Sequence, residues 1–345
     1  MIYLTEMTFY YAVPSIFLFL AWLVNSKTLM YISIFAGFFT IFDRTFAYDS
    51  ISYINIYNGY HEIYEPSFVL LVDIFKFFGA DSNKFLFFIP VINVVIFYFM
   101  GHNLFKRKRE QILLIAIWMS SVWYISYSCN AMRQGFASLL IWYGLSAWLR
   151  GMIFRAIPGF VIGAMFHWSS AFLFILFITA TRIRIGNSLI LNIFIGLSLA
   201  LLSSSTNPLS YLSNVIGYFD PDMLEPRFSP NLRLSVCSVI FLFHLINSSH
   251  FDSLFSYLFN IYKLHFFMLC LMVSIPEGFS RIHAYIWPLD AILLTYTLSH
   301  HYSIRISKDH RTGHMLMLYL VFLIFATFVG FGSITSANLL GINEE

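Results

Sequence analysis

Apolar runs of about 15–20 residues recur along this chain and are separated by short polar segments. Runs of this length match the helix that crosses the hydrocarbon core of a bilayer. Because no water is available there, spans must be helices or a closed barrel, and continuous runs favour helices over the alternation of barrel strands. The pattern predicts an all-α, polytopic integral membrane protein with about 12 transmembrane helices, in a range of about 11–14.

The predicted spans are Thr8–Val24, Thr28–Phe42, Phe85–Met100, Ile112–Tyr127, Gly135–Leu149, Met152–Phe166, Ser169–Thr181, Ser188–Leu202, Ser235–Ile246, Leu264–Ser274, His283–Leu298 and Met315–Phe331. The segment Pro66–Phe78 differs from them, because it is apolar on one face only and carries Asp73 and Lys76. This favours a half-helix at the membrane interface. A true crossing is the alternative, and it would move everything before Pro66 to the opposite side of the membrane.

Basic residues predict which loops face the cytoplasm, because short cytoplasmic loops carry an excess of Lys and Arg. The run Lys106–Arg109 is entirely basic and is therefore placed inside. Counting spans from this run puts most other Lys and Arg, including Lys263, in inner loops. It also puts a polar segment at residues 43–84 and a loop at residues 203–234 outside, within one transmembrane domain over residues 1–345.

Charged residues make up 11% of the chain and hydrophobic residues 59%, whereas a soluble protein has about 25% charged residues. Each charge near a span is therefore a candidate for function. In a membrane protein the distribution of Lys and Arg among the loops is what matters, so the formal net charge of +3 does not indicate a nucleic-acid partner. The three cysteines are scattered, and no nucleotide-binding or metal-binding motif occurs. We expect buried thiols, no cofactor and no metal.

Arginines on the predicted outer face are candidates for binding an anion. Arg44, Arg133 and Arg281 lie at or near membrane boundaries in three separate outer segments. A guanidinium binds phosphate oxygens through paired N–H groups and keeps its charge, so converging arginines suit a pyrophosphate. Each one alone can instead be an anchor to lipid headgroups. Further candidates for substrate contact are Arg227, Arg233, Asn130, Gln134 and Tyr48, of which the two arginines can also pair with acids of their own loop.

Three side chains of the same outer face are candidates for accepting a proton. Asp49 and Glu65 belong to a polar island over Phe42–Phe68 that is rich in charges and tyrosines. His167 follows an apolar run, and imidazole titrates near neutral pH. A lone histidine in such a run is otherwise a structural residue. We rank Asp49 first, His167 second and Glu65 third.

These residues fall in short motifs whose order resembles a known family. Arg44 and the Tyr48-Asp49 pair are followed by YEPSF at residues 64–68, NAMRQGFA at 130–137, AMFHWSSAF at 164–172 and FSRIHAYIW at 279–287. The pattern resembles the EpsG family of Wzy-type polysaccharide repeat-unit polymerases. The resemblance is clearest over residues 40–180 and returns at residues 275–290.

The resemblance implies a bacterial inner-membrane glycosyltransferase whose active side faces the periplasm or cell exterior. Such an enzyme transfers a growing glycan from undecaprenyl pyrophosphate to another lipid-linked repeat unit. The resemblance also implies an architecture like that of GT-C glycosyltransferases, with an outer active-site loop after an early span. The implied partners are the lipid-linked oligosaccharide and the bilayer, together with a chain-length regulator protein and a flippase.

Three other functions fit parts of the same sequence. A flippase for lipid-linked oligosaccharides would place its charges in a central cavity reached from both sides, whereas here they gather at one face. An O-antigen ligase would use the same donor with a lipid A-core acceptor, and the sequence does not separate it from a polymerase. Acyl transfer within the membrane is the third, and it rests on one histidine.

Overall fold

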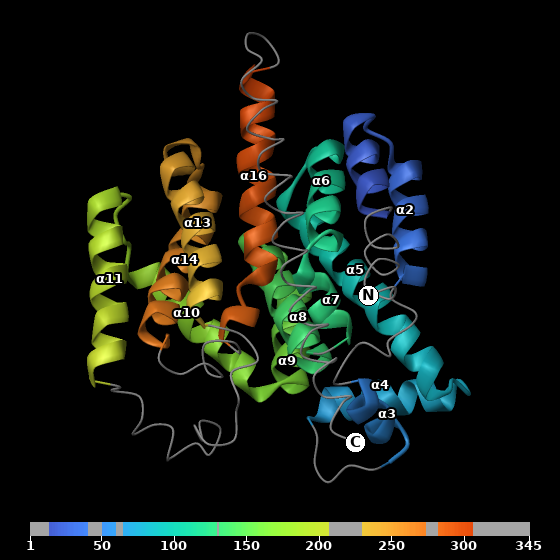
Figure 1. Ribbon diagram of the computed structural model, residues 1–345. Helices are drawn as coiled ribbons and strands as arrows, with labels where there is room; N and C mark the ends of the chain where they lie inside the picture. The colour runs from blue at the N-terminus through green and yellow to red at the C-terminus, as the bar shows by residue number, and fades with distance from the viewer. Residues whose placement is uncertain are drawn as a thin grey trace, which may run out of the picture. The chain divides into compact units, whose positions relative to one another are not determined.

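The computed structural model describes residues 14–40, 50–59, 65–129, 131–206, 230–273 and 282–305. These residues form helices joined by short connections, and no strand occurs among them (Figure 1). The chain divides into two compact units, one of residues 1–171 with 302–345 and the other of residues 172–301. For the described part of the chain, the prediction of an all-α protein is confirmed.

The first unit contains a helix over Pro14–Leu23, α2 (Lys27–Thr40), α3 (Ser50–Tyr57), α4 (Pro66–Phe77), α5 (Ser82–Leu104), α6 (Lys108–Met119), α7 (Val122–Cys129), α8 (Met132–Leu149), α9 (Ile153–Phe166) and the 3-10 helix η1 (Trp168–Ala171). The second unit contains α10 (Phe172–Arg182), α11 (Leu189–Thr206), α13 (Pro230–Asn247), the 3-10 helix η3 (Ser248–His250), α14 (Ser253–Leu271) and most of α16 (Trp287–Arg305).

The described helices have the composition and exposure of a membrane protein. Both α5 and α14 are long and apolar enough to cross a bilayer, judged by length and composition, and shorter apolar helices accompany them. On α9, Phe154, Ile157 and Val161 are each more than half exposed and lie on one helical face. Water would make such a stripe unfavourable, whereas hydrocarbon accommodates it. The number of spans and the GT-C-like architecture stay predictions.

One predicted span is two helices in the structure. The run Ile112–Tyr127 is divided between α6 and α7 at Ser120 and Ser121. The Ser121 hydroxyl donates to the carbonyl of Trp118 at 2.6 Å and accepts from the backbone N–H of Tyr124 at 3.4 Å. Serine side chains that bond to nearby backbone groups compete with the helical pattern, so the apolar run alone did not reveal the break.

A second predicted span starts too late. Residues 264–271 of the predicted span Leu264–Ser274 belong to α14, which runs from Ser253 to Leu271. The Asp252 carboxylate accepts from the backbone N–H of Phe255 at 2.9 Å and caps this helix. The prediction that Lys263 lies in an inner loop is also wrong, because the residue lies inside α14 and is 3% exposed.

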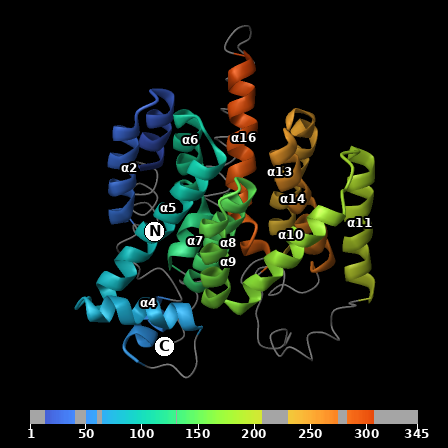
Figure 2. The same ribbon diagram turned by 180° about the vertical axis from the view of Figure 1, so that it is seen from behind.

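The short helix α4 lies differently from the helices around it. It has 12 residues and is therefore about 18 Å long, less than the roughly 30 Å of a bilayer's hydrocarbon core. Figures 1 and 2 show it at a steep angle to α8 and α9, beside the end where α8 begins and α9 ends. That α4 rests at the membrane interface stays a prediction.

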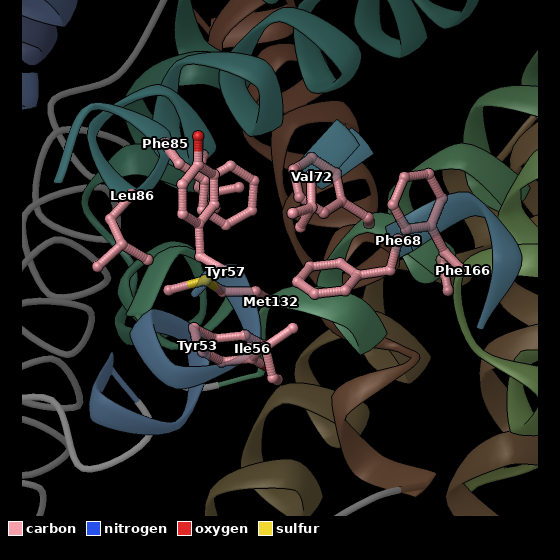
Figure 3. Packing of buried hydrophobic residues seen from close by; sticks show 12 residues of the cluster. Tyr53, Ile56, Tyr57, Phe68, Val72, Phe85, Leu86, Met132 and Phe166 are labelled. Atoms are coloured by element: carbon pink, nitrogen blue, oxygen red, sulfur yellow. The ribbon is translucent and has the colours of Figure 1, made fainter. Parts of the chain in front are cut away.

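A buried hydrophobic cluster joins α3, α4, α5, α8 and α9 (Figure 3). Its members are Tyr53, Ile56, Tyr57, Phe68, Val72, Phe85, Leu86, Ile89, Met132, Phe136, Ala137 and Phe166. Aromatic rings connect the helices in pairs, with centroids 5.1 Å apart for Tyr57 and Phe85 and 5.2 Å apart for Phe136 and Phe166. The cluster therefore fixes α4 against the ends of α8 and α9.

Helices α8 and α9 approach each other closely through glycines. A Cβ atom on Gly159 would lie 2.9 Å from the Gly144 Cα and from the Leu140 carbonyl oxygen. On Gly163, a Cβ would lie 2.7 Å from the Ile141 side chain. Gly159 and Gly163 are four residues apart and lie on the face of α9 that meets α8, and only residues without a Cβ allow so close a contact.

We expect Gly159→Val to separate α8 from α9, because the added carbons meet backbone atoms that cannot turn away. Overpacking of this kind lowers the free energy of unfolding by about 1–3 kcal/mol. Thermal unfolding of the detergent-solubilised protein measures the loss. Gly186→Val is the matched control, because a Cβ there meets no atom within 4 Å. An unchanged midpoint for Gly159→Val would contradict the close contact.

Candidate functional site

Three predicted site residues lie at the edge of the hydrophobic cluster. Glu65 precedes α4, Arg133 lies in the first turn of α8, and His167 directly follows α9. Each has a buried cluster member within three residues along the chain, namely Phe68, Met132 and Phe166. The cluster therefore holds three distant segments of the first unit so that their polar side chains meet.

Local sequence explains how two of these residues leave the helical pattern. Pro66 occupies the first turn of α4, where its missing N–H costs no hydrogen bond, so Glu65 stays extended before it. The Glu65 side chain makes no capping hydrogen bond to α4 and is available to other partners. His167 is extended as well, which ends α9, and the backbone N–H of Ser170 donates to its carbonyl at 2.9 Å.

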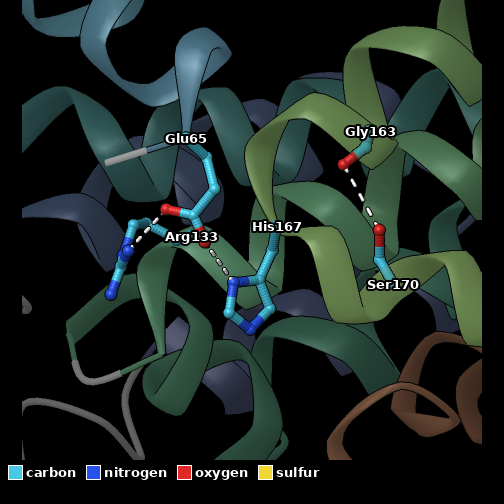
Figure 4. A network of polar contacts seen from close by, with 5 residues as sticks. All are labelled: Glu65, Arg133, Gly163, His167 and Ser170. Carbon is cyan, nitrogen blue, oxygen red and sulfur yellow. Dashed lines mark hydrogen bonds and ion pairs between the residues drawn. The ribbon is translucent and has the colours of Figure 1, made fainter. Parts of the chain in front are cut away.

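The Glu65 carboxylate joins the other two residues (Figure 4). Its Oε2 accepts from Arg133 Nη1 at 2.5 Å, and its Oε1 lies 2.7 Å from His167 Nδ1. The Glu65 side chain is 9% exposed, whereas the side chains of Arg133 and His167 are 28% and 19% exposed. The acid thus lies behind a cation and an imidazole that both reach the surface.

The environment of Glu65 decides which proton chemistry it can perform. Burial by itself would raise the pKa of the carboxyl, but the hydrogen bond to His167 and the charge and hydrogen bond of Arg133 outweigh it. The pKa falls to about 2. A carboxylate with so low a pKa is a weak proton acceptor near neutral pH. Glu65 is therefore suited to hold its neighbours and not to deprotonate a substrate.

Two further contacts support the arrangement. The Tyr53 side chain of α3 interacts with the Arg133 guanidinium, a contact that the sequence did not suggest. The Ser170 hydroxyl donates to the Gly163 carbonyl at 3.4 Å, which ties η1 back to α9 around His167 (Figure 4). Tyr53 is one of several tyrosines of the polar island, and its contact with Arg133 distinguishes it.

The other predicted site residues divide into two groups. Gln134 follows Arg133 in α8 and is partly buried, and Arg233 lies in α13, where its side chain is not described. The residues Arg44, Tyr48, Asn130, Asp49, Arg227 and Arg281 lie outside the described residues. Their assignment to the site stays a prediction. The structure brings together Glu65, Arg133 and His167.

The second unit holds buried polar groups that the sequence did not single out. Lys263 Nζ donates to the Ile185 carbonyl and, at 2.8 Å, to Asn187 Oδ1, and so fixes the segment before α11 against α14. Asp290 is 4% exposed in the first turn of α16. The sequence could have pointed to Asp290, because it is a lone acid within an apolar run.

Cysteine and histidine also meet in the second unit. Cys237 Sγ lies 2.9 Å from His283 Nε2, and both residues are buried. The expectation of buried thiols is confirmed for Cys237 and Cys270. Among the described residues, no group of three or more His, Cys, Asp or Glu is arranged to hold a metal ion.

Comparison with known proteins gives one match. The family model described as the EpsG family matches residues 27–339, which is nearly the whole chain. No curated protein and no solved structure matches the chain. The matched region includes most of the first unit and all of the second, and Glu65, Arg133 and His167 lie within it.

The lowered pKa of Glu65 predicts a dependence of stability on pH. Because the folded-state pKa of about 2 lies below the ordinary value of 4.5, the stabilisation is present above about pH 5 and is lost as the pH falls toward 2. We expect the wild type to unfold at a higher temperature than Glu65→Gln at about pH 5. This difference between the two thermal midpoints should become smaller toward about pH 3. Asp73→Asn, at an exposed carboxylate of α4, is the control. An advantage that does not change with pH would contradict the assignment.

Proposed function

Because this chain belongs to the EpsG family of Wzy-like polymerases, we propose that it polymerises oligosaccharide repeat units carried on undecaprenyl pyrophosphate. The proposed reaction takes place on the outer side of a bacterial inner membrane. The acceptor hydroxyl oxygen bonds to the anomeric carbon of the donor glycan while the bond from that carbon to the pyrophosphate oxygen breaks. The lipid pyrophosphate leaves with the bonding electrons.

The meeting of Glu65, Arg133 and His167 carries this proposal. The three residues come from the motifs YEPSF, NAMRQGFA and AMFHWSSAF, which are separated by long apolar stretches. In the structure one oxygen of the buried Glu65 carboxylate binds Arg133, and the other binds His167. A cation beside an imidazole supports transfer of a glycan away from an anionic leaving group, which needs charge stabilisation and a proton acceptor.

Arg133 is the proposed anchor for the pyrophosphate. Its guanidinium is partly exposed and carries five N–H donors, so it can bind phosphate oxygens while Glu65 holds Nη1. The negative charge on the pyrophosphate grows as the glycosidic bond breaks, and a positioned guanidinium then stabilises it more strongly. Arg44 and Arg281 are proposed to share this role, and Arg227, Arg233, Asn130, Gln134 and Tyr48 are proposed contacts to the substrate.

His167 is the proposed acceptor of the hydroxyl proton. Glu65 is less suited to that role than the sequence indicated, because its pKa is lowered to about 2. The His167 side chain is partly exposed, and the bare nitrogen of a neutral imidazole can accept a proton. Asp49, the first choice from the sequence, stays a second candidate for the same step.

The setting of the enzyme is part of the proposal. The helical fold and apolar segments fit a membrane protein, and about 12 spans with a GT-C-like arrangement are proposed for it. The proposed partners are the lipid-linked substrate and the bilayer, with a chain-length regulator and a flippase acting beside it. The donor's pyrophosphate linkage supplies the bond energy, so the reaction requires no nucleotide.

We expect Arg133→Ala to slow polymerisation at least about 100-fold, because one positioned donor to a developing charge contributes that much. His167→Ala should slow it by about 10²–10⁴-fold, the usual contribution of a single base. The measurement is glycan length after purified protein in detergent is incubated with lipid-linked repeat units. Elongation in this membrane-free, lipid A-free mixture also separates a polymerase from a flippase and from a ligase.

Two variants control this assay. Arg133→Lys keeps the charge but loses the paired N–H groups, so it should fold and remain slow. Arg155→Ala removes an exposed arginine of α9, whose Nη1 lies 3.8 Å from Met152 Sδ, and should leave the rate unchanged. Near-normal polymerisation by Arg133→Ala and His167→Ala would overturn the roles given to both residues.

The proposed outer location of the site predicts a labelling pattern. Ser52 is exposed on α3, in the same segment as Glu65. In a variant without native cysteines, Ser52→Cys should react with a membrane-impermeant thiol reagent added to intact spheroplasts. Arg155→Cys lies in the first turn of α9, at the end of this helix that the basic-residue count places on the cytoplasmic side, and it should react only after permeabilisation. The reverse pattern would place Glu65 and its partners on the cytoplasmic side.

A further inference from the structure

The contact between Glu65 and His167 joins one defined atom of each residue. Glu65 Oε1 lies 2.7 Å from His167 Nδ1, while Nε2, on the other side of the ring, points away from the carboxylate (Figure 4). The two nitrogens of a neutral imidazole have opposite roles, since one carries the proton and the other a lone pair. Which nitrogen is which depends on the hydrogen bond made by its neighbour.

We propose that Glu65 is a positioning residue that holds His167 with its proton on Nδ1, so that Nε2 presents a lone pair to the acceptor hydroxyl. This proposal rests on the proposed glycosyl transfer and assigns a distinct part in it to Glu65. The carboxylate does not touch the substrate. It acts by selecting one tautomer and one orientation of the ring.

The carboxylate leaves His167 no other neutral arrangement. An ionised carboxylate only accepts hydrogen bonds, so a neutral imidazole can bind it only by donating from Nδ1. Arg133 occupies the second oxygen and is also purely a donor, so it reinforces the charge that selects this tautomer. Because Glu65 is buried and held at both oxygens, its position is set before substrate binds.

The proposed proton transfer balances with these assignments. The acceptor hydroxyl gives its proton to Nε2 as its oxygen bonds to the anomeric carbon. The ring becomes an imidazolium with protons on both nitrogens, and Oε1 of Glu65 stabilises the positive charge through the Nδ1–H bond. The bond between the anomeric carbon and the pyrophosphate breaks, and its electrons stay on the leaving oxygen near Arg133.

Glu65→Gln tests the proposal because glutamine reverses the selection. Arg133 can only donate, so the amide oxygen must face Arg133 and the amide NH₂ must face His167. Nδ1 then has to accept, which moves the proton to Nε2 and removes the lone pair that the hydroxyl needs. We therefore expect Glu65→Gln to fold and bind donor but to lose activity, although the side chain is nearly isosteric.

The activity test measures kcat and KM separately for the wild type and for Glu65→Gln at neutral pH. We expect kcat to fall at least about 100-fold in Glu65→Gln, as for loss of a base, while KM for the lipid-linked donor stays within about threefold. Glu65→Asp keeps the charge on a shorter side chain and should recover part of kcat. A kcat for Glu65→Gln within about threefold of the wild type would overturn the proposal. Thermal midpoints of each variant, measured in the same detergent, identify any that fail to fold.

The tautomer can be measured without any turnover. In protein labelled with ¹⁵N-histidine, the resonances missing from His167→Gln belong to His167, and protonated and bare ring nitrogens resonate far apart. We expect a protonated Nδ1 and a bare Nε2 in the wild type and the reverse in Glu65→Gln. The same tautomer in both proteins would overturn the proposal. If the tautomer of His167 differs between the wild type and Glu65→Gln as expected, but the wild type elongates no glycan, the proposed function is disproved. The selection of the tautomer by Glu65 would still stand.

Discussion

The Glu65 carboxylate can remain charged in a buried position because Arg133 and His167 each bind one of its oxygens. A buried carboxylate without partners would be strongly unfavourable and would take up a proton. Here both partners come from other segments, so the two contacts require α4, α8 and α9 to meet in one arrangement. The polar contact and the helix packing therefore depend on each other.

The packing of α4, α8 and α9 depends on small and aromatic residues. Gly144 and Gly159 let the backbones of α8 and α9 approach until a Cβ atom would no longer fit. Rings such as Phe136 and Phe166 then fill the space beside the ends of the two helices, and Phe68 brings the start of α4 to the same place. Without a hydrophobic force between helices in lipid, such close fit is the main source of association.

The sequence indicated helices and a set of candidate residues, but it did not show which of these residues meet. Length and polarity of the apolar runs predicted helices, and boundary charges pointed to Glu65, Arg133 and His167, because each is costly near hydrocarbon. Periodicity could not show the break at Ser121 or the true start of α14, since both depend on side-chain bonds to the backbone. Periodicity also could not rank the candidate acids as proton acceptors, because the low pKa of Glu65 arises from partners more than 60 residues away along the chain.

The arrangement also explains how an acid can lie beside a proposed pyrophosphate site. The Glu65 side chain is less exposed than those of Arg133 and His167, so an anion in solvent has more access to the guanidinium and the imidazole than to the carboxylate. With neutral His167, the three groups are together neutral, and uptake of a proton on Nε2 leaves them with one positive charge. In the proposed reaction this charge appears as negative charge grows on the leaving pyrophosphate. The positive charge then stabilises the transition state more than the bound substrate, which is the condition for accelerating the reaction.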